Sequence, residues 1–275
     1  AAFRLMPSMN RIILASQNLR YGHAATQRIY EELEILKNSV DVNIKNEIIN
    51  EKFHTLKLKN ISFSYNEKTH IFNNIDFEIK KGDFIGIIGE TGSGKSTLID
   101  LLTGLINPSS GKIICNDKYE ITNCSVSWQS KIGYAPQMFN LLDDTIENNI
   151  SFDNSSKKNE KVLQDSIKIS VLEEFIEKNP NKLKSIVGER GIQISGGQRQ
   201  RIIIARALYR KPEILILDEA TNALDSSTEQ KIITNLCEKK AADLTIIMVT
   251  HRESSLKKCN KILRVKNKTI TIENN

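Results

Sequence analysis

Nine consecutive residues read GETGSGKST and fit the pattern G-x-x-x-x-G-K-[ST], in which a lysine and a hydroxyl residue close a glycine-rich loop. The loop follows an apolar run at 84–88 and precedes a helix-like stretch at 97–105, the context in which such a loop binds phosphate. Glycines let backbone N–H groups surround phosphate oxygens, and the start of a helix favours an anion. We expect Lys95 to reach the β- and γ-phosphates and the Ser96 hydroxyl to ligate Mg²⁺. The alternative is an ordinary glycine-rich turn before a helix. The residues predicted to bind the nucleotide are Gly89, Glu90, Thr91, Gly92, Ser93, Gly94, Lys95, Ser96 and Thr97.

Two adjacent carboxylates follow a second apolar run, 214–217. A buried strand would deliver them at its carboxyl end, where ligands bind in open α/β sheets. There Asp218 would hold Mg²⁺. Glu219 would polarise the attacking water as a general base, a role that contributes typically about 10²- to 10⁴-fold in rate. Many strands end in acidic loop residues, so this pair alone is a weak signal. The phosphate loop earlier in the chain makes the catalytic interpretation much stronger.

The segment Ile194-Ser195-Gly196-Gly197-Gln198 has no place in a generic phosphate-loop kinase. It resembles the signature motif of ABC-transporter nucleotide-binding domains, usually written LSGGQ, with isoleucine in place of leucine. Its serine and glycines can present a hydroxyl and backbone N–H groups at a helix start, which makes a second anion site. In that family the signature acts in trans on the γ-phosphate bound by the opposite subunit. The resemblance therefore implies a head-to-tail dimer with ATP between two copies, and a single copy that hydrolyses poorly.

The other motifs of the family occur in the family's order. The resemblance implies that Tyr65 stacks on adenine, although a tyrosine in a strand core is the alternative. It implies that Gln137 touches Mg²⁺ and the water, and that the loop from Asn222 to Asp225 crosses the dimer interface. His251 matches the histidine that binds the γ-phosphate and supports the transition state. A lone histidine after a strand would otherwise be a structural residue.

Hydrophobic periodicity predicts an α/β fold. Apolar residues alternate at 61–65 and 75–79, which is typical of half-buried antiparallel strands. Three other runs are continuously apolar and suit strands covered on both faces; they occupy 84–88, 214–217 and 245–249. Helical patterns dominate about 139–207. With the resemblance, we predict an ABC ATPase cassette with a mixed-sheet core, an antiparallel β subdomain and an inserted helical subdomain.

The first 50 residues differ from the rest in that they carry a helical pattern and one glycine. We expect an amphipathic helix with a break near Tyr21-Gly22, then a polar linker at about 38–51. Because no Met begins the chain, we expect a fragment of a longer protein. The segment from Phe3 to Ser8 resembles the end of the last transmembrane helix and the linker of fused exporters. The resemblance implies that residues 1–50 are the end of that helix and the linker helices of a missing membrane domain, and that 51–275 are the nucleotide-binding domain. The alternative is an ordinary helical extension.

Further segments favour the exporter branch of the family. Val187 to Gly191 resembles a segment typical of exporters, in which the equivalent of Glu189 lies near the coupling helices. Among fused exporters, the chain is similar to the bacterial lipid-linked oligosaccharide flippases and related export proteins. The resemblance implies ATP and Mg²⁺ as cofactors, a second copy and a transmembrane domain of the same chain as partners, and a place on the cytoplasmic face of the cell membrane. One departure is Asn267-Lys268, where a hairpin favours Asn-Gly.

Composition bears on which partners and which classes of protein the sequence allows. Thirty-nine basic against 33 acidic residues give a net charge of +6 without interleaved aromatics, so we expect no nucleic-acid partner. The four cysteines lack metal-ligand spacing, and no apolar run approaches the roughly 20 residues of a membrane span. The main alternative is a soluble ABC-class ATPase of translation or chromosome maintenance. The single unbroken cassette in this chain argues against it. A non-catalytic cassette usually lacks the glutamate or histidine, and both are present here.

Overall fold

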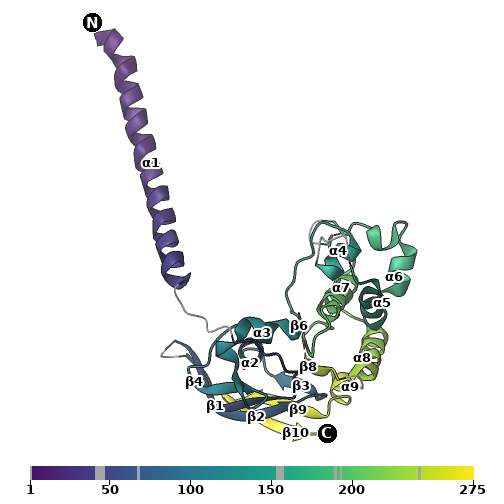
Figure 1. The fold of residues 1–275 in the computed structure, drawn as a ribbon. Coiled ribbons are helices and arrows are strands. Elements are labelled where there is room, and N and C mark those ends of the chain that lie inside the picture. The colour runs from purple at the N-terminus through teal and green to yellow at the C-terminus, as the bar shows by residue number, and fades with distance from the viewer. Residues whose placement is uncertain are drawn as a thin grey trace. The chain divides into compact units, whose positions relative to one another are not determined.

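The computed structural model describes residues 2–40, 47–66, 69–152, 158–188, 191–192, 194–240 and 243–275. The chain divides into two compact units, Ala1–Lys45 and Asn46–Asn275. The first unit is helix α1 (Ala2–Val40), which runs without interruption through Tyr21 and Gly22 (Figure 1). The predicted break is therefore wrong: a single glycine in a helix interior costs about 1 kcal/mol relative to alanine, which a long helix tolerates. Residues 41–46 of the predicted linker lie outside the described residues.

No helix in the described ranges combines the length and the apolar character that a membrane span requires.

The second unit contains an antiparallel sheet of order β2-β1-β4-β5. Along β1, Leu56 and Leu58 are buried in alternation, and so are Ile61 and Phe63, with a register shift against β2 between Leu58 and Ile61. Tyr65, the last residue of the predicted alternation, is exposed. The pairing of β1 with β2 confirms the predicted antiparallel strands. The strands are β1 (Thr55–Asn66), β2 (Thr69–Lys80), β4 (Ser110–Cys115) and β5 (Tyr119–Glu120).

A mixed sheet of order β10-β9-β3-β8-β7-β6 forms the centre of this unit. All neighbours are parallel except β9 and β10. Every residue of β7 and β8 is buried, which is why these strands are continuously apolar. The strands are β3 (Phe84–Gly89), β6 (Ile132–Ala135), β7 (Ile214–Asp218), β8 (Thr245–Val249), β9 (Lys261–Lys266) and β10 (Thr269–Asn274).

The two faces of the mixed sheet belong to different cores. On β7, Ile214 and Ile216 join the core shared with β1 and β2, whereas Leu215 and Leu217 join the core shared with the later helices. Helices α4 to α7 group together away from β1 and β2 (Figure 1), within the region for which helical patterns were predicted. The helices are α2 (Lys95–Thr103), α3 (Ser125–Ser130), α4 (Ile146–Ser151), α5 (Glu160–Ile169), α6 (Glu173–Lys178), α7 (Gly196–Tyr209), α8 (Ser226–Lys240) and α9 (Glu253–Leu256), with 3-10 turns at Ile121–Asn123 and Lys182–Lys184.

The β9–β10 hairpin turns at Asn267 and Lys268, whose φ angles are 51° and 63°. Positive φ at both central residues is what a type I′ hairpin turn requires. The lysine therefore adopts the conformation for which glycine is the usual residue.

Candidate nucleotide-binding site

The predicted catalytic residues lie at one edge of the mixed sheet. Strand β8 pairs with β3 on one side and β7 on the other, so that Val249 is aligned with both Ile87 and Asp218. The carboxyl ends of β3, β8, β7 and β6 therefore meet at the same edge, which is where open α/β sheets bind ligands. The elements that follow these strands are, in that order, the phosphate loop, His251, Glu219 and Gln137.

The phosphate loop depends on its glycines for its shape. Gly94 has φ 107°, and a Cβ added there would lie 2.7 Å from Ile71 Cγ2. Lys95 is buried, and its Nζ donates to Gly89 O at 2.8 Å and Glu90 O at 2.9 Å. An ammonium group has three N–H donors, so these two bonds hold Lys95 across the loop and leave one donor for a phosphate oxygen.

The loop also contains an unsatisfied hydroxyl. Ser93 Oγ is buried and has no hydrogen-bond partner among the described residues. A buried polar atom without a partner costs free energy. A phosphate group in the loop would supply the missing acceptor, so the loop fits a nucleotide phosphate.

Tyr65 lies beside this loop. Its hydroxyl is 3.1 Å from Thr97 Oγ1, and its ring packs edge-on against Phe63 at 5.0 Å. The side chain is 59% exposed. An exposed ring anchored to α2 has the accessibility that stacking on a base requires, and that a core tyrosine would lack.

Glu219 stands at the centre of a hydrogen-bonded cluster. Gln137 Nε2 donates to Glu219 Oε2 at 2.7 Å, and Asn222 Nδ2 donates to the same oxygen at 2.9 Å. His251 Nε2 lies 3.8 Å from Glu219 Oε1. The backbone of Glu219 has φ 50°, a region that residues other than glycine rarely occupy. Residues held in this region are often found at functional sites. The carboxylate is thus held through one oxygen, while the other faces the histidine.

The bond from Asn222 to Glu219 was not predicted from the sequence. The sequence assigned Asn222 to the interface loop, and its three-residue separation from Glu219 is the only signal that could have pointed to the contact.

Asp218 is buried and lies next to other carboxylates. Burial raises the pKa of Asp218, and the charges of Glu219 and Asp100 raise it further, while the Tyr134 hydrogen bond and Lys95 lower it. The Tyr134 hydroxyl donates to Asp218 Oδ2 at 3.2 Å. Sequence reasoning missed this tyrosine, whose only signal was a polar tip in an otherwise apolar strand.

The donors around Asp218 fit a magnesium ion. A divalent cation would offset the crowded negative charge, and Mg²⁺ binds oxygen ligands. The Ser96 hydroxyl is exposed in the first turn of α2. Because Gln137 donates to Glu219 through its nitrogen, its side-chain oxygen is the atom left for a cation. Ser96, Gln137 and Asp218 are therefore the residues that could hold the ion.

The signature residues form a separate structure. Ser195 caps α7, with its Oγ accepting from Gln198 N at 3.2 Å while Gln198 Oε1 accepts from Ser195 N at 2.8 Å. A surface hollow in which no phosphate-loop residue takes part is bordered by Ser195, Gly196, Gly197, Arg201, Ala223, Leu224, Asp225 and Thr228. The described structure does not bring the signature to its own phosphate loop.

Asp225 also borders this hollow. Its Oδ1 accepts from Ser227 Oγ at 2.6 Å and from Thr228 N at 2.9 Å, which caps α8. These hydrogen bonds hold the pKa of Asp225 well below its usual range. The carboxylate is thus fixed at the end of the loop predicted to cross the dimer interface. Glu189 of the exporter-like segment lies outside the described residues.

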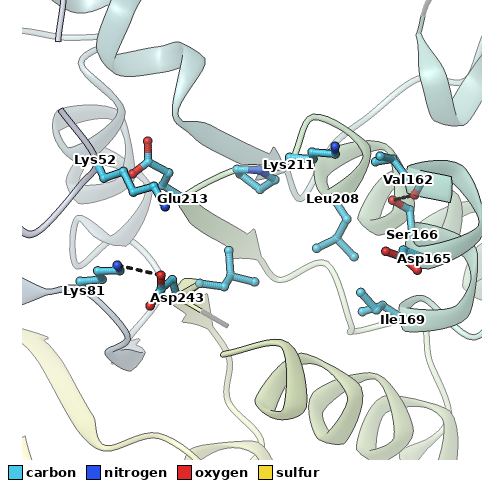
Figure 2. Close-up of a pocket in the computed structure, with 12 residues that line it drawn as sticks. Lys52, Lys81, Val162, Asp165, Ser166, Ile169, Leu208, Lys211, Glu213 and Asp243 are labelled. Atoms are coloured by element: carbon cyan, nitrogen blue, oxygen red, sulfur yellow. Dashed lines mark hydrogen bonds and ion pairs between the residues drawn. The ribbon is translucent and has the colours of Figure 1, made fainter. Parts of the chain in front are cut away.

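A cavity at the opposite edge of the sheet contains none of the predicted site residues. It lies where β7 and β8 begin, and α5 contributes Val162, Asp165, Ser166 and Ile169 to its wall (Figure 2). Lys81 and Asp243 form an ion pair of 2.9 Å across its other side. The nucleotide chemistry predicted from the sequence thus has no counterpart in this cavity.

Comparison with known proteins places these features in context. A family model described as ABC transporter matches residues 72–222, more than half of the chain. An export ATP-binding/permease protein of Rickettsia bellii is 41% identical over 211 residues, which are 76% of this chain and 36% of the relative. An ATP-dependent lipid A-core flippase of Photobacterium profundum is 32% identical over 270 residues, 96% of this chain and 45% of the relative. The solved structure of a bacterial Atm1-family ABC exporter with ATP bound matches with a TM-score of 0.76 and 28% identity, over 89% of this chain and 44% of that chain. The chain spans less than half the length of each of these relatives.

Proposed function

The chain belongs to the ABC transporter family, and we propose that it is the ATP-hydrolysing motor domain of an exporter-type transporter. The observation that carries the proposal is the Glu219 carboxylate, fixed by two side-chain amides at the sheet edge that also carries the phosphate loop. This arrangement combines a phosphate-binding loop with a positioned base, as hydrolysis of a nucleotide requires.

The residues of this site have distinct roles in the proposed reaction. The phosphate loop and Lys95 bind the phosphates, and Tyr65 stacks on the adenine. Ser96, Gln137 and Asp218 would hold the Mg²⁺, which when bound neutralises charge on the phosphate oxygens. Glu219 accepts a proton from the attacking water, and His251 stabilises charge that develops on the γ-phosphate.

We propose that two copies form the working unit. The signature hollow of each copy presents a helix start and a serine hydroxyl, which suit an anion. Since that hollow contains no phosphate-loop residue of its own chain, the anion it receives is the ATP bound by a second copy. The two copies then close head to tail around two ATP molecules, and the intact set of motifs in this chain makes two equivalent sites in a homodimer.

The membrane part of the proposal is supported by the relatives. They are named as export ATP-binding/permease proteins and lipid A-core flippases, and this chain spans under half of their length. We propose that residues 1–50 continue into a transmembrane domain of the same polypeptide, and that residues 51–275 lie on the cytoplasmic face of the cell membrane. ATP hydrolysis would then drive export or the flipping of a lipid-linked substrate.

The variant Glu219→Gln tests the catalytic proposal. It keeps the size of the side chain but removes the base, so ATP binding is retained while turnover falls by about 10²- to 10⁴-fold. Binding is measured by calorimetry and turnover by phosphate release at high protein concentration. Glu238→Gln on α8, which changes an exposed carboxylate, is the matched control. Equal turnover in Glu219→Gln and wild type would reject Glu219 as the base.

The membrane proposal is tested in fractionated native cells with an antibody against residues 51–275. The expected result is a membrane-bound band well above the 31.1 kDa of this chain. A soluble band near that mass would contradict a fused transporter and favour an ABC-class ATPase outside transport.

A further inference from the structure

A buried carboxylate on α8 connects three parts of the molecule. The Glu229 side chain is 2% exposed. Its Oε1 accepts from Thr221 Oγ1 at 2.9 Å and from Ser255 Oγ at 2.8 Å, and its Oε2 bonds with Arg252 Nη1. Because a buried charge is costly unless it is paired and hydrogen-bonded, these partners bind α8, α9 and the loop after β7 to one point.

Arg252 extends this connection to the loop directly. Its Nη2 donates to Asn222 O at 3.1 Å and to Leu224 O at 3.0 Å. The planar fork of a guanidinium can bond a carboxylate and two carbonyls at once, which an ammonium on a lysine stem cannot do in the same geometry. The pair of Glu229 and Arg252, here called the loop clamp, therefore fixes the backbone of residues 221–224.

The clamped loop makes two contacts that bear on the site. Asn222 Nδ2 donates to Glu219 Oε2, and Ala223 N donates to Gln200 Oε1 on α7 at 2.8 Å. The first contact orients the proposed base. Its geometry depends on where the loop backbone lies, and the loop clamp sets that position.

We propose that Glu229 and Arg252 are positioning residues for ATP hydrolysis: they hold the loop so that the Asn222 amide keeps Glu219 in its working orientation. The inference rests on the proposed function. A hollow beside the phosphate loop, whose lining includes Gly89, Glu90 and Thr91, has neither clamp residue in its wall. We therefore expect a loosened clamp to leave the affinity for ATP unchanged and to lower kcat through Glu219. A merely structural role would lower stability and leave the turnover of folded molecules as it was.

The test is a double-mutant cycle between Arg252→Lys and Asn222→Ala, with kcat, the KM for ATP and the melting temperature measured for each variant. Arg252→Lys keeps the charge that Glu229 needs but loses the fork. We expect each single variant to lower kcat by about tenfold, with KM within about twofold of wild type, in the range seen when supporting contacts of a site are removed. Because both act through Glu219, the double variant should be no more than about twofold slower than the slower single variant.

Two results would overturn the inference: an unchanged kcat in folded Arg252→Lys, or losses that multiply to about a hundredfold in the double variant. Arg210→Lys, an exposed arginine at the end of α7, is the matched control. If Arg252→Lys fails to fold, Glu229→Gln takes its place in the cycle, since it keeps the shape of the side chain. If Glu219→Gln leaves turnover unchanged, the proposed function is contradicted. If Glu219→Gln lowers turnover but the variants of the loop clamp do not, this inference alone is contradicted.

Discussion

The carboxyl edge of the mixed sheet and the start of α7 are organised in opposite ways. At the sheet edge, side chains far apart in sequence bond one another: Gln137 and Glu219 are separated by 82 positions. At the start of α7, Ser195 and Gln198 are three positions apart and satisfy each other in a capping box. The first region exists only in the folded sheet, while the second is a local structure.

This difference indicates that the two regions have different roles in the proposed reaction. A site built from several strands can fix a base, a lysine and a cation-binding carboxylate in one place, which hydrolysis requires. A capped helix start offers hydrogen-bond donors and a favourable field but contains no base. The start of α7 is thus suited to the role proposed for it, which is to complete a reaction centre on a second copy of the chain.

Among the variants that test this comparison, Ser195→Ala should have the largest effect on turnover. The serine Oγ accepts from Gln198 N in the cap, and its O–H remains available to donate to a phosphate. Removing a donor to a developing anion costs about 10²- to 10³-fold in turnover, while loss of the cap costs about 1 kcal/mol. Thr145→Ala is the matched control because it removes the cap of α4, where Thr145 Oγ1 accepts from Asn148 N, and Thr145 does not border the signature hollow. Only its stability should change.

Mixing variants separates the two regions directly. In a dimer of Ser195→Ala with Glu219→Gln, one site has an intact base from the first chain and an intact signature from the second. An equal mixture of two chains should therefore recover about one quarter of wild-type turnover, if copies pair at random about a two-fold axis. Turnover no higher than that of the separate variants would show that the signature does not act in trans.

Glycine-to-alanine substitutions in the two regions should differ in their effect on stability. Gly94→Ala should lower the free energy of unfolding by about 2–3 kcal/mol, because φ is 107° and the new Cβ would lie 2.7 Å from Ile71. Gly196→Ala places its Cβ 3.6 Å from Ala223, an ordinary contact, so its stability should change by no more than about 0.5 kcal/mol. Its turnover should still fall, because the methyl lies on the face proposed to meet the second copy. Urea unfolding and phosphate release measure the two effects; equal destabilisation in both variants would contradict the contrast.

The two regions also differ in how far the sequence could predict them. The phosphate loop and the signature are contiguous segments, and the continuous apolar run of β7 predicted where Asp218 and Glu219 would lie. Contacts between segments carry no such signal. The Tyr134 bond to Asp218 and the loop clamp depend on which strands and helices are neighbours, which only the folded chain determines.

The helix α1 shows a different limit. The sequence predicts a break at Gly22, but the unfavourable helix propensity of one glycine is small beside the propensities summed over the 39 residues of the helix. The Asn267-Lys268 turn is similar, because the hairpin imposes positive φ on a lysine, a residue that rarely adopts it. Local preference failed in both places because the surrounding structure determines the backbone.

The smallest expected effect concerns Asp225, which borders the signature hollow. Hydrogen bonds from Ser227 and from the Thr228 backbone lower the pKa of Asp225. A carboxylate with a depressed pKa stabilises the fold above its unfolded pKa of about 3.9, and that stability is lost as the pH falls towards the folded pKa. Asp225→Asn should therefore be modestly less stable than wild type at about pH 7, and the gap should narrow below about pH 4. Ser227→Ala removes the largest cause of the shift, so it should show a smaller gap with the same dependence on pH. Melting temperatures across this range provide the measurement, and a gap that does not change with pH would mean that the carboxylate contributes through shape rather than charge.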